Sequence, residues 1–296
     1  IDVEDEDSLS ERMSNEKVVG QIDLVVVRLP RISNFTDFNI FESIPGVSVR
    51  YVKRAAQLGN PDLILLPGTK NTMSDLAWMR QSGMEAAVLK AHAAGCPIFG
   101  ICGGYQMLGE ELSDPFGVED GGTMRGMGLL PMHTVFTEEK TRTRVNGQFL
   151  QVKGDLAGLS GIAFSGYEIH MGQSVLDGKL SMLTKISDHC DHVGHTSEGS
   201  ADGGAKTLLQ SGSAMEKCEG AIGENVYGSY VHGIFDAQEV VNAIVKALAE
   251  KKGIDPAGLA QMDYAAYKET QYDKMADILR KHLDMEQIYR ILDAGV

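Results

Sequence analysis

Short apolar runs that alternate with helical segments constrain the fold of this chain more than any other feature. The runs cover residues 22–29, 63–66 and 97–101. They lack the polar alternation of a half-exposed strand, which is typical of strands buried on both faces. Helical patterns begin near Thr72 and Met84. Strands that alternate with helices predict an α/β fold with a mostly parallel central sheet flanked by helices.

The second half of the chain has a different pattern. Short β-like stretches separated by glycines extend from Gly126 to about residue 183, and they predict extra β segments beside the central sheet. Residues 187–220 are rich in Gly, Ser, Asp and His, which indicates a long surface loop. A helix with one apolar stripe is expected near residues 240–248, and apolar residues at helical spacing continue in the C-terminal tail.

These patterns suggest three parts of the chain. Residues 1–20 are polar and acidic, and we interpret them as a linker from a preceding domain that is missing here. Residues 21–253 are expected to form the main domain. Residues 254–296 are expected to form a helical tail that packs on the same domain.

Composition excludes several classes of function. The net charge is -14, which argues against binding to nucleic acid or to an acidic membrane surface, since both require clustered Lys and Arg. The sequence has no long apolar run that could span a membrane and no basic leader before an apolar segment. The four cysteines form no C-x-x-C pair, so we expect a reduced, cytoplasmic environment with one thiol available for chemistry.

The nucleophile is expected within Gly100-Ile101-Cys102-Gly103-Gly104, directly after a buried strand. A nucleophile elbow needs small residues on both sides of the nucleophile, because the turn from strand to helix is tight. The elbow would place Cys102 at a helix N-terminus, where the helix dipole favours the reactive thiolate. The alternative interpretation is a glycine-rich packing turn around a structural cysteine.

A nucleophilic cysteine needs a base, and His232 is the best candidate among the eight histidines. It follows an apolar β-like segment and precedes a glycine, which places it at a strand end, where active-site loops gather in α/β folds. The loop sequence HCDHVGH at residues 189–195 has metal-ligating residue types, but no predicted strand or helix to hold them rigid. We therefore expect a solvated loop there and no metal site.

These motifs resemble the class I glutamine amidotransferases. The segment GICGGYQMLG at residues 100–109 is similar to their nucleophile segment, and LLPGTKNT at residues 65–72 to their oxyanion loop. GYEIHMG at residues 166–172 and YVHGIFD at residues 230–236 resemble the branch that amidates corrinoid precursors. RLPRISNFTDF at residues 28–38 is similar to the cobyric acid synthase family in particular.

The resemblance assigns roles to individual residues. It implies that Cys102 attacks the side-chain amide of glutamine, and that His232 activates the thiol and protonates the departing ammonia. The backbone N–H groups of Gly68 and Gly103 would hold the oxyanion. Gln106 would help to seat the glutamine, although an ordinary helix-surface amide is the alternative.

Two further assignments stay open. Many class I amidotransferases have a Glu two residues after the base to orient it, whereas this chain has Ile234 there. Asp236 is a candidate for the orienting carboxylate, which could also come from elsewhere or be absent. Glu168 and His170 share one face of a strand, where they would either line the substrate site or join neighbouring strands.

The resemblance also implies partners. Amidation of a carboxylate requires activation by ATP, and this chain has no G-x-x-x-x-G-K-[ST] loop to bind phosphates. We therefore expect no cofactor on this chain, with ATP, Mg²⁺ and most of the corrinoid bound by an N-terminal synthetase domain.

Alternative functions remain open at this point. The chain could serve another ligase, such as cobyrinic acid diamide synthase or an enzyme that amidates peptidoglycan precursors. It could also be an inactive scaffold that uses the fold for binding, or a cysteine hydrolase with a related elbow.

Overall fold

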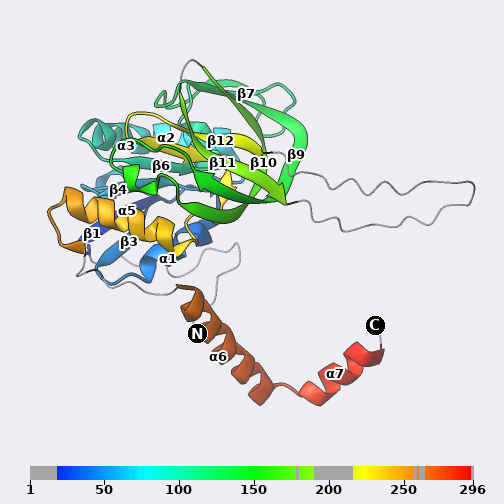
Figure 1. Cartoon of the computed structure of the whole chain (residues 1–296). Helices are drawn as coiled ribbons and strands as arrows, with labels where there is room; N and C mark the ends of the chain where they lie inside the picture. The colour runs from blue at the N-terminus through cyan, green and yellow to red at the C-terminus, as the bar shows by residue number, and fades with distance from the viewer. Residues whose placement is uncertain (1–18, 178–179, 190–215, 257–258, 260–263, 295–296) are drawn as a thin grey trace, which may run out of the picture.

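The computed structural model describes residues 19–177, 180–189, 216–256, 259 and 264–294. One mixed sheet of 12 strands forms its centre (Figure 1). The parallel part has the order β13 (Val226–Ser229), β6 (Ile98–Ile101), β4 (Leu63–Leu66), β1 (Ile22–Val27) and β3 (Val47–Val52). This part confirms the parallel sheet expected from the sequence.

Antiparallel strands extend the same sheet beyond β13. Their order is β12 (Glu216–Ile222), β11 (Ser181–His189), β9 (Met132–Phe149), β10 (Ala163–Leu176) and β14 (Val231–His232). Strand β7 (Glu111–Asp114) pairs with β9 and with β8 (Gly122–Arg125). A separate two-stranded sheet joins β2 (Ile32–Ser33) to β5 (Gly68–Thr69).

The expectation of short β stretches after Gly126 is wrong, because β9 has 18 residues and β10 has 14. Gly147, Gly166 and Gly172, which suggested strand ends, lie inside these strands. A Cβ atom on Gly147 would lie 2.4 Å from the ring of Phe164. Glycine here therefore marks close packing between side chain and backbone rather than a turn.

The predicted surface loop at residues 187–220 is too long at both ends. β11 continues to His189 and β12 begins at Glu216. The intervening residues 190–215, which include most of the expected HCDHVGH loop, lie outside the described residues.

Helices cover the parallel part of the sheet. They are α1 (Asn39–Glu42), α2 (Thr72–Gln81), α3 (Met84–Ala93), α4 (Gly103–Met107) and α5 (Gln238–Lys251). The apolar stripe of α5 is buried, and it contains Val240, Val241, Ile244, Val245 and Leu248. In the described part of the chain, no helix has the length and apolar character that would let it cross a membrane.

The C-terminal tail is helical, as expected, and forms α6 (Tyr264–His282) and α7 (Met285–Ala294). Figure 1 shows both helices extending from the body that contains the sheet. No described side chain of α7 is buried, and Gln271 is the buried residue of α6 among those described. The packing of this tail on the domain, and the domain limits at residues 20 and 253, therefore stay predictions.

Glycines allow α4 to pack directly on the sheet behind the elbow. A Cβ atom on Gly104 would lie 2.1 Å from the carbonyl oxygen of Leu66, in β4. One on Gly100 would lie 2.8 Å from the backbone of Gly104. The obstacle at Gly104 is backbone, which cannot move away as a flexible side chain can, so any larger residue must displace α4.

We predict that Gly104→Ala lowers the free energy of unfolding by about 2 kcal/mol or more, the scale of overpacking in a close-packed interior. Urea unfolding monitored by circular dichroism measures this difference. Gly158→Ala is the control, because its added Cβ would meet nothing closer than 4.0 Å. Equal stability of the two variants would contradict the close approach of α4 to β4.

Candidate functional site

Cys102 lies at a strained turn between β6 and α4. Its φ of 51° and ψ of -111° place a non-glycine residue in a region that L-amino acids rarely occupy. Two backbone bonds hold the turn: the Cys102 N–H donates to the Ser229 carbonyl at 2.8 Å, and the Gln106 N–H donates to the Cys102 carbonyl at 3.0 Å. Strain of this kind persists only where the surrounding structure enforces it, and it is typical of functional sites.

His232 reaches Cys102 from the other part of the sheet. It ends β14, which pairs with β10, and its side chain is 1% exposed. Its side chain interacts with that of Cys102, which contributes to the raised pKa of His232. The Cys102 thiol itself donates to the Ile169 carbonyl at 3.7 Å. Gly68 lies against the ring edge, since a Cβ atom there would be 3.0 Å from Cε1 of His232. The structure thus brings together three of the residues expected at the site.

The carboxylate that contacts His232 is Asp37 rather than Asp236. Nδ1 of His232 lies 2.7 Å from Oδ2 of Asp37, whose other oxygen accepts a 2.9 Å hydrogen bond from the Gly233 N–H. Asp236 instead lines a separate open cavity with Asn146 and other residues. Asp37 therefore occupies the position expected of an orienting carboxylate.

Apolar packing fixes the segment that carries Asp37. This residue lies in the short 3-10 helix η2 (Phe35–Phe38), directly after Asn34, whose φ is 52°. The ring of Phe38 lies 6.1 Å from that of Phe235, three residues after His232. Sequence reasoning singled out RISNFTDF as a family marker but missed Asp37, because nothing in a sequence pairs residues 195 positions apart.

The environment of His232 favours its protonated form. Burial lowers the pKa of His232, but the charge of Asp37 and the hydrogen bonds to Asp37 and Cys102 outweigh burial and raise it to about 10. An imidazolium beside a cysteine favours the nucleophilic thiolate.

Cys102 opens into a pocket of about 450 Å³. Its charged lining residues are Glu119, Lys70 and Lys140. Burial raises the pKa of Glu119, whose carboxylate accepts a hydrogen bond from the Met73 N–H at 2.9 Å. A carboxylate and two ammonium groups around one cavity can bind the charged groups of an amino acid.

Gln106 lies in the wall of this pocket rather than on a helix surface, since it is 2% exposed. Its carbonyl oxygen accepts a hydrogen bond from the Thr72 hydroxyl at 2.9 Å, and its NH₂ group donates to the Tyr230 hydroxyl at 3.3 Å. Tyr230 in turn lies 2.7 Å from the Ser174 hydroxyl. These contacts fix the orientation of the Gln106 amide.

Glu168 and His170, the two β10 residues considered for the site, have different environments. His170 lines the pocket and stacks on Tyr230 with ring centroids 3.9 Å apart. Glu168 is 1% exposed and binds Lys217 of β12 at 2.8 Å, so it joins two segments of the sheet. Hydrogen bonds to His170 and Lys217 outweigh burial and lower the pKa of Glu168.

Gly103 follows Cys102 and packs against the loop that contains Gly68 and Thr69. A Cβ atom on Gly103 would lie 2.7 Å from the side chain of Thr69, next to Gly68. The two residues expected to supply oxyanion donors therefore lie on neighbouring segments beside Cys102, and that role stays a proposal.

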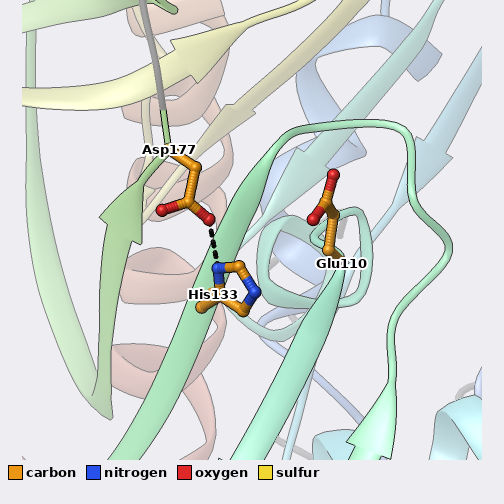
Figure 2. Close-up of side chains that lie close together, drawn as sticks. All are labelled: Glu110, His133 and Asp177. Carbon is orange, nitrogen blue, oxygen red and sulfur yellow. Dashed lines mark ion pairs between the residues drawn. The ribbon is translucent and has the colours of Figure 1, made fainter.

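Glu110, His133 and Asp177 form a cluster outside this pocket that has metal-ligating atoms within 4.8 Å of one another (Figure 2). Nδ1 of His133 makes an ion pair with Asp177. Both carboxylates are exposed, and exposed acidic groups gather in this way without a cation. The residues could hold a metal, but their pairing and exposure give no reason to assign one.

Comparisons with known proteins match this chain to one family of domains. The model of the CobB/CobQ-like glutamine amidotransferase domain matches residues 23–240. A cobyric acid synthase of Ruminiclostridium cellulolyticum is 49% identical over 100% of this chain and 54% of its own length. One of Citrobacter koseri is 41% identical over 99% of this chain and 54% of its own length. The chain thus spans about half the length of these curated relatives.

A solved structure shares the fold. The match to the structure of PurLQS from Thermotoga maritima covers 77% of this chain and 99% of that chain, with a TM-score of 0.53 at 18% identity. At this identity the likeness concerns the fold alone.

We predict that Asp37→Asn destabilises the protein most at low pH. The pKa of His232 rises from 6.5 to about 10 on folding, so the ion pair stabilises fully below pH 6.5 and loses its effect as the pH rises through 10. The loss should be about 3 kcal/mol at pH 6, the scale for a buried ion pair that loses one partner.

Urea unfolding at pH 6, 8 and 10 tests this expectation. Asp23→Asn is the matched control, because the buried Asp23 pairs with Arg50 and touches no histidine among its described contacts. Its effect on the free energy of unfolding should change little with pH. A constant loss in Asp37→Asn across this range would show that the charge of His232 does not depend on Asp37.

Proposed function

Since this chain belongs to the CobB/CobQ-like glutamine amidotransferase domain family, we propose that it hydrolyses glutamine with Cys102 as the nucleophile and His232 as the base. The observation that supports this most is the strained Cys102 beside a buried His232–Asp37 pair at a pocket of amino-acid size. An inactive scaffold would have no need to maintain this strain and this buried ion pair.

The reaction proceeds through a thioester. The thiolate of Cys102 attacks the side-chain carbonyl carbon of glutamine, and the oxyanion accepts hydrogen bonds from the backbone N–H groups of Gly68 and Gly103. His232 gives its proton to the departing nitrogen, so ammonia leaves and a glutamyl thioester remains. His232 then takes a proton from water, which attacks the thioester and releases glutamate and Cys102. Asp37 keeps the ring oriented and stabilises its positive charge.

The pocket charges support glutamine as the substrate. Glu119 would bind the α-ammonium group, and Lys70 and Lys140 would face the α-carboxylate. Gln106, held by Thr72 and Tyr230, would contact the substrate from the pocket wall.

We assign the ammonia to the amidation of a corrinoid. The relatives that match nearly the whole chain are named cobyric acid synthase, and this chain covers 54% of their length. The part of the relatives that lies outside the match would then bind ATP, Mg²⁺ and most of the corrinoid, and would use ATP to activate the corrinoid carboxylates. A second candidate function is to supply ammonia to another ligase of this family, such as cobyrinic acid diamide synthase.

Cys102→Ala should abolish covalent labelling by a chloroketone analogue of glutamine, measured by intact-protein mass spectrometry. Cys96→Ala is the control and should keep full labelling, because burial raises the pKa of the Cys96 thiol to about 12 and makes it a poor nucleophile. Labelling that persists in Cys102→Ala, or that disappears in Cys96→Ala, would show that the nucleophile is misassigned.

Glu119→Gln should raise the KM for glutamine about tenfold or more, while kcat changes less than about threefold. A charged hydrogen bond to the substrate contributes about 1.5–3 kcal/mol, and the α-ammonium group lies away from the bond that breaks. Steady-state ammonia release measures both constants, with the exposed Glu111→Gln as control. An unchanged KM would remove Glu119 from the substrate site.

The chain alone, supplied with glutamine, ATP, magnesium and cobyrinic acid a,c-diamide, should release ammonia but form no amide. A carboxylate is a poor electrophile at neutral pH. We assign its activation to the part of the relatives that this chain does not match. Mass spectrometry of the corrinoid detects amidation. Amide formed by the chain alone would locate an activating site within these residues, whereas amide formed only by the full-length protein agrees with the proposal.

A further inference from the structure

Glu219 is a buried carboxylate that takes no direct part in the mechanism above. It lies in β12 opposite Thr184 of β11 and is 5% exposed. A buried carboxylate is unfavourable unless donors satisfy its oxygens, so its contacts show what it does in the fold.

Three donors bind Glu219, and two of them come from the chain that leads to His232. The Tyr230 N–H donates to Oε1 at 2.6 Å, and the Ser229 hydroxyl donates to Oε2 at 2.7 Å. The Thr184 hydroxyl donates to Oε2 at 3.1 Å. The carboxylate therefore holds residues 229–230 in place, because each of its two oxygens accepts a hydrogen bond from this segment.

These contacts occur where the chain leaves one part of the sheet for another. β13 ends at Ser229, parallel to β6, and β14 begins at Val231, antiparallel to β10. Backbone N–H groups at such a break need acceptors outside the regular ladder. Glu219 accepts from the Tyr230 N–H, and the Ser229 hydroxyl oxygen accepts from the Val231 N–H at 3.0 Å.

Residues 229–231, where β13 gives way to β14, position three parts of the active site. The Ser229 carbonyl accepts the N–H of Cys102 at 2.8 Å. The Tyr230 hydroxyl binds Gln106, and His232 follows two residues later. A shift of this short segment would move the base, the pocket wall and the nucleophile relative to one another.

We propose that Glu219 is a positioning residue of the glutaminase site, which acts by holding residues 229–231 so that His232 and Tyr230 reach Cys102 and Gln106. This inference rests on the proposed function.

Protonation of Glu219 weakens its hydrogen bonds to residues 229–230 near neutral pH. Burial raises the pKa of Glu219 to about 7, against hydrogen bonds from Tyr230, Ser229 and Thr184 that lower it. The protonated form loses one acceptor. The titratable groups that face Glu219 are Glu168 from β10, Tyr105 from α4 and Tyr230. The pKa of Glu168 is lowered and burial raises those of both tyrosines, so these three groups do not titrate near pH 7.

Activity and stability should then respond to pH in opposite directions. The folded pKa of Glu219, about 7, exceeds its ordinary value of 4.5, so its contribution to stability is present below pH 4.5 and is lost as the pH rises through 7. Glu219→Gln removes this loss, so its stability relative to that of the wild type should rise between pH 4.5 and 7. If the charged carboxylate positions the site, the same variant should lose the most activity above pH 7.

The test compares the full-length wild type and Glu219→Gln at pH 6.0 and 8.5, with glutamine hydrolysis and alkylation of Cys102 by iodoacetamide as readouts. At pH 8.5 we expect kcat and the alkylation rate of the variant to fall about tenfold or more, with the KM within about threefold. At pH 6.0 the gap should shrink to less than about threefold, because the wild-type carboxylate is then protonated and resembles glutamine.

Two further variants complete the test. Ser229→Ala removes one donor to Glu219 and the acceptor for the Val231 N–H, and it should reduce kcat in the same direction if Glu219→Gln does not fold. Asp23→Asn alters another buried carboxylate, 3% exposed, that is bonded to Ser48 and Arg50. It should change stability without changing kcat.

The outcomes separate this inference from the proposed function. Wild-type kcat and alkylation rate in Glu219→Gln at pH 8.5, in a protein that hydrolyses glutamine, would overturn the role of Glu219 and leave the proposed function intact. A wild-type protein that hydrolyses no glutamine would refute the proposed function. The alkylation rates would then still decide whether Glu219 positions His232 beside Cys102.

Discussion

The buried ion pair between His232 and Asp37 joins two segments that lie 195 residues apart in the sequence. Its strength depends on exclusion of water, because charges attract each other more strongly in the interior than at the surface. The exclusion of water from this ion pair in turn requires the apolar packing of Phe38 and Phe41 against Phe235. The aromatic cluster, the ion pair and the protonated state of His232 therefore depend on one another.

The mixed sheet explains how such distant residues meet. Its parallel part ends at β13 beside β6, and Cys102 directly follows β6. Its antiparallel part ends at β14, and His232 is the last residue of β14. Only one residue, Tyr230, separates β13 from β14. The chain thus changes from one kind of pairing to the other directly beside Cys102 and His232, and the buried Glu219 accepts a backbone hydrogen bond there.

The elbow shows how backbone constraints select residue types. Cys102 has a positive φ at a cost that the fold must offset, whereas the glycines around it permit contacts that a Cβ atom would prevent. These requirements are local in sequence, which is why G-x-C-x-G was recognisable without a structure. The glycines of β9 and β10 misled the sequence analysis, because glycine in a close-packed strand and glycine in a turn look alike in one dimension.

The sequence by itself determined the parallel part of the sheet, the strand ends that carry Cys102 and His232, and the family. These features depend on short-range patterns: apolar runs, turn glycines and motifs within a few residues. Only the tertiary structure decided that Asp37 rather than Asp236 contacts His232. It also decided that His170 lines the pocket while Glu168 binds Lys217. The hydrogen bond from the Tyr230 N–H to Glu219, just before His232, likewise follows only from the tertiary structure. The physical reason is that a carboxylate finds its partner through space, and the strand order and register that set those distances follow from packing over the whole chain.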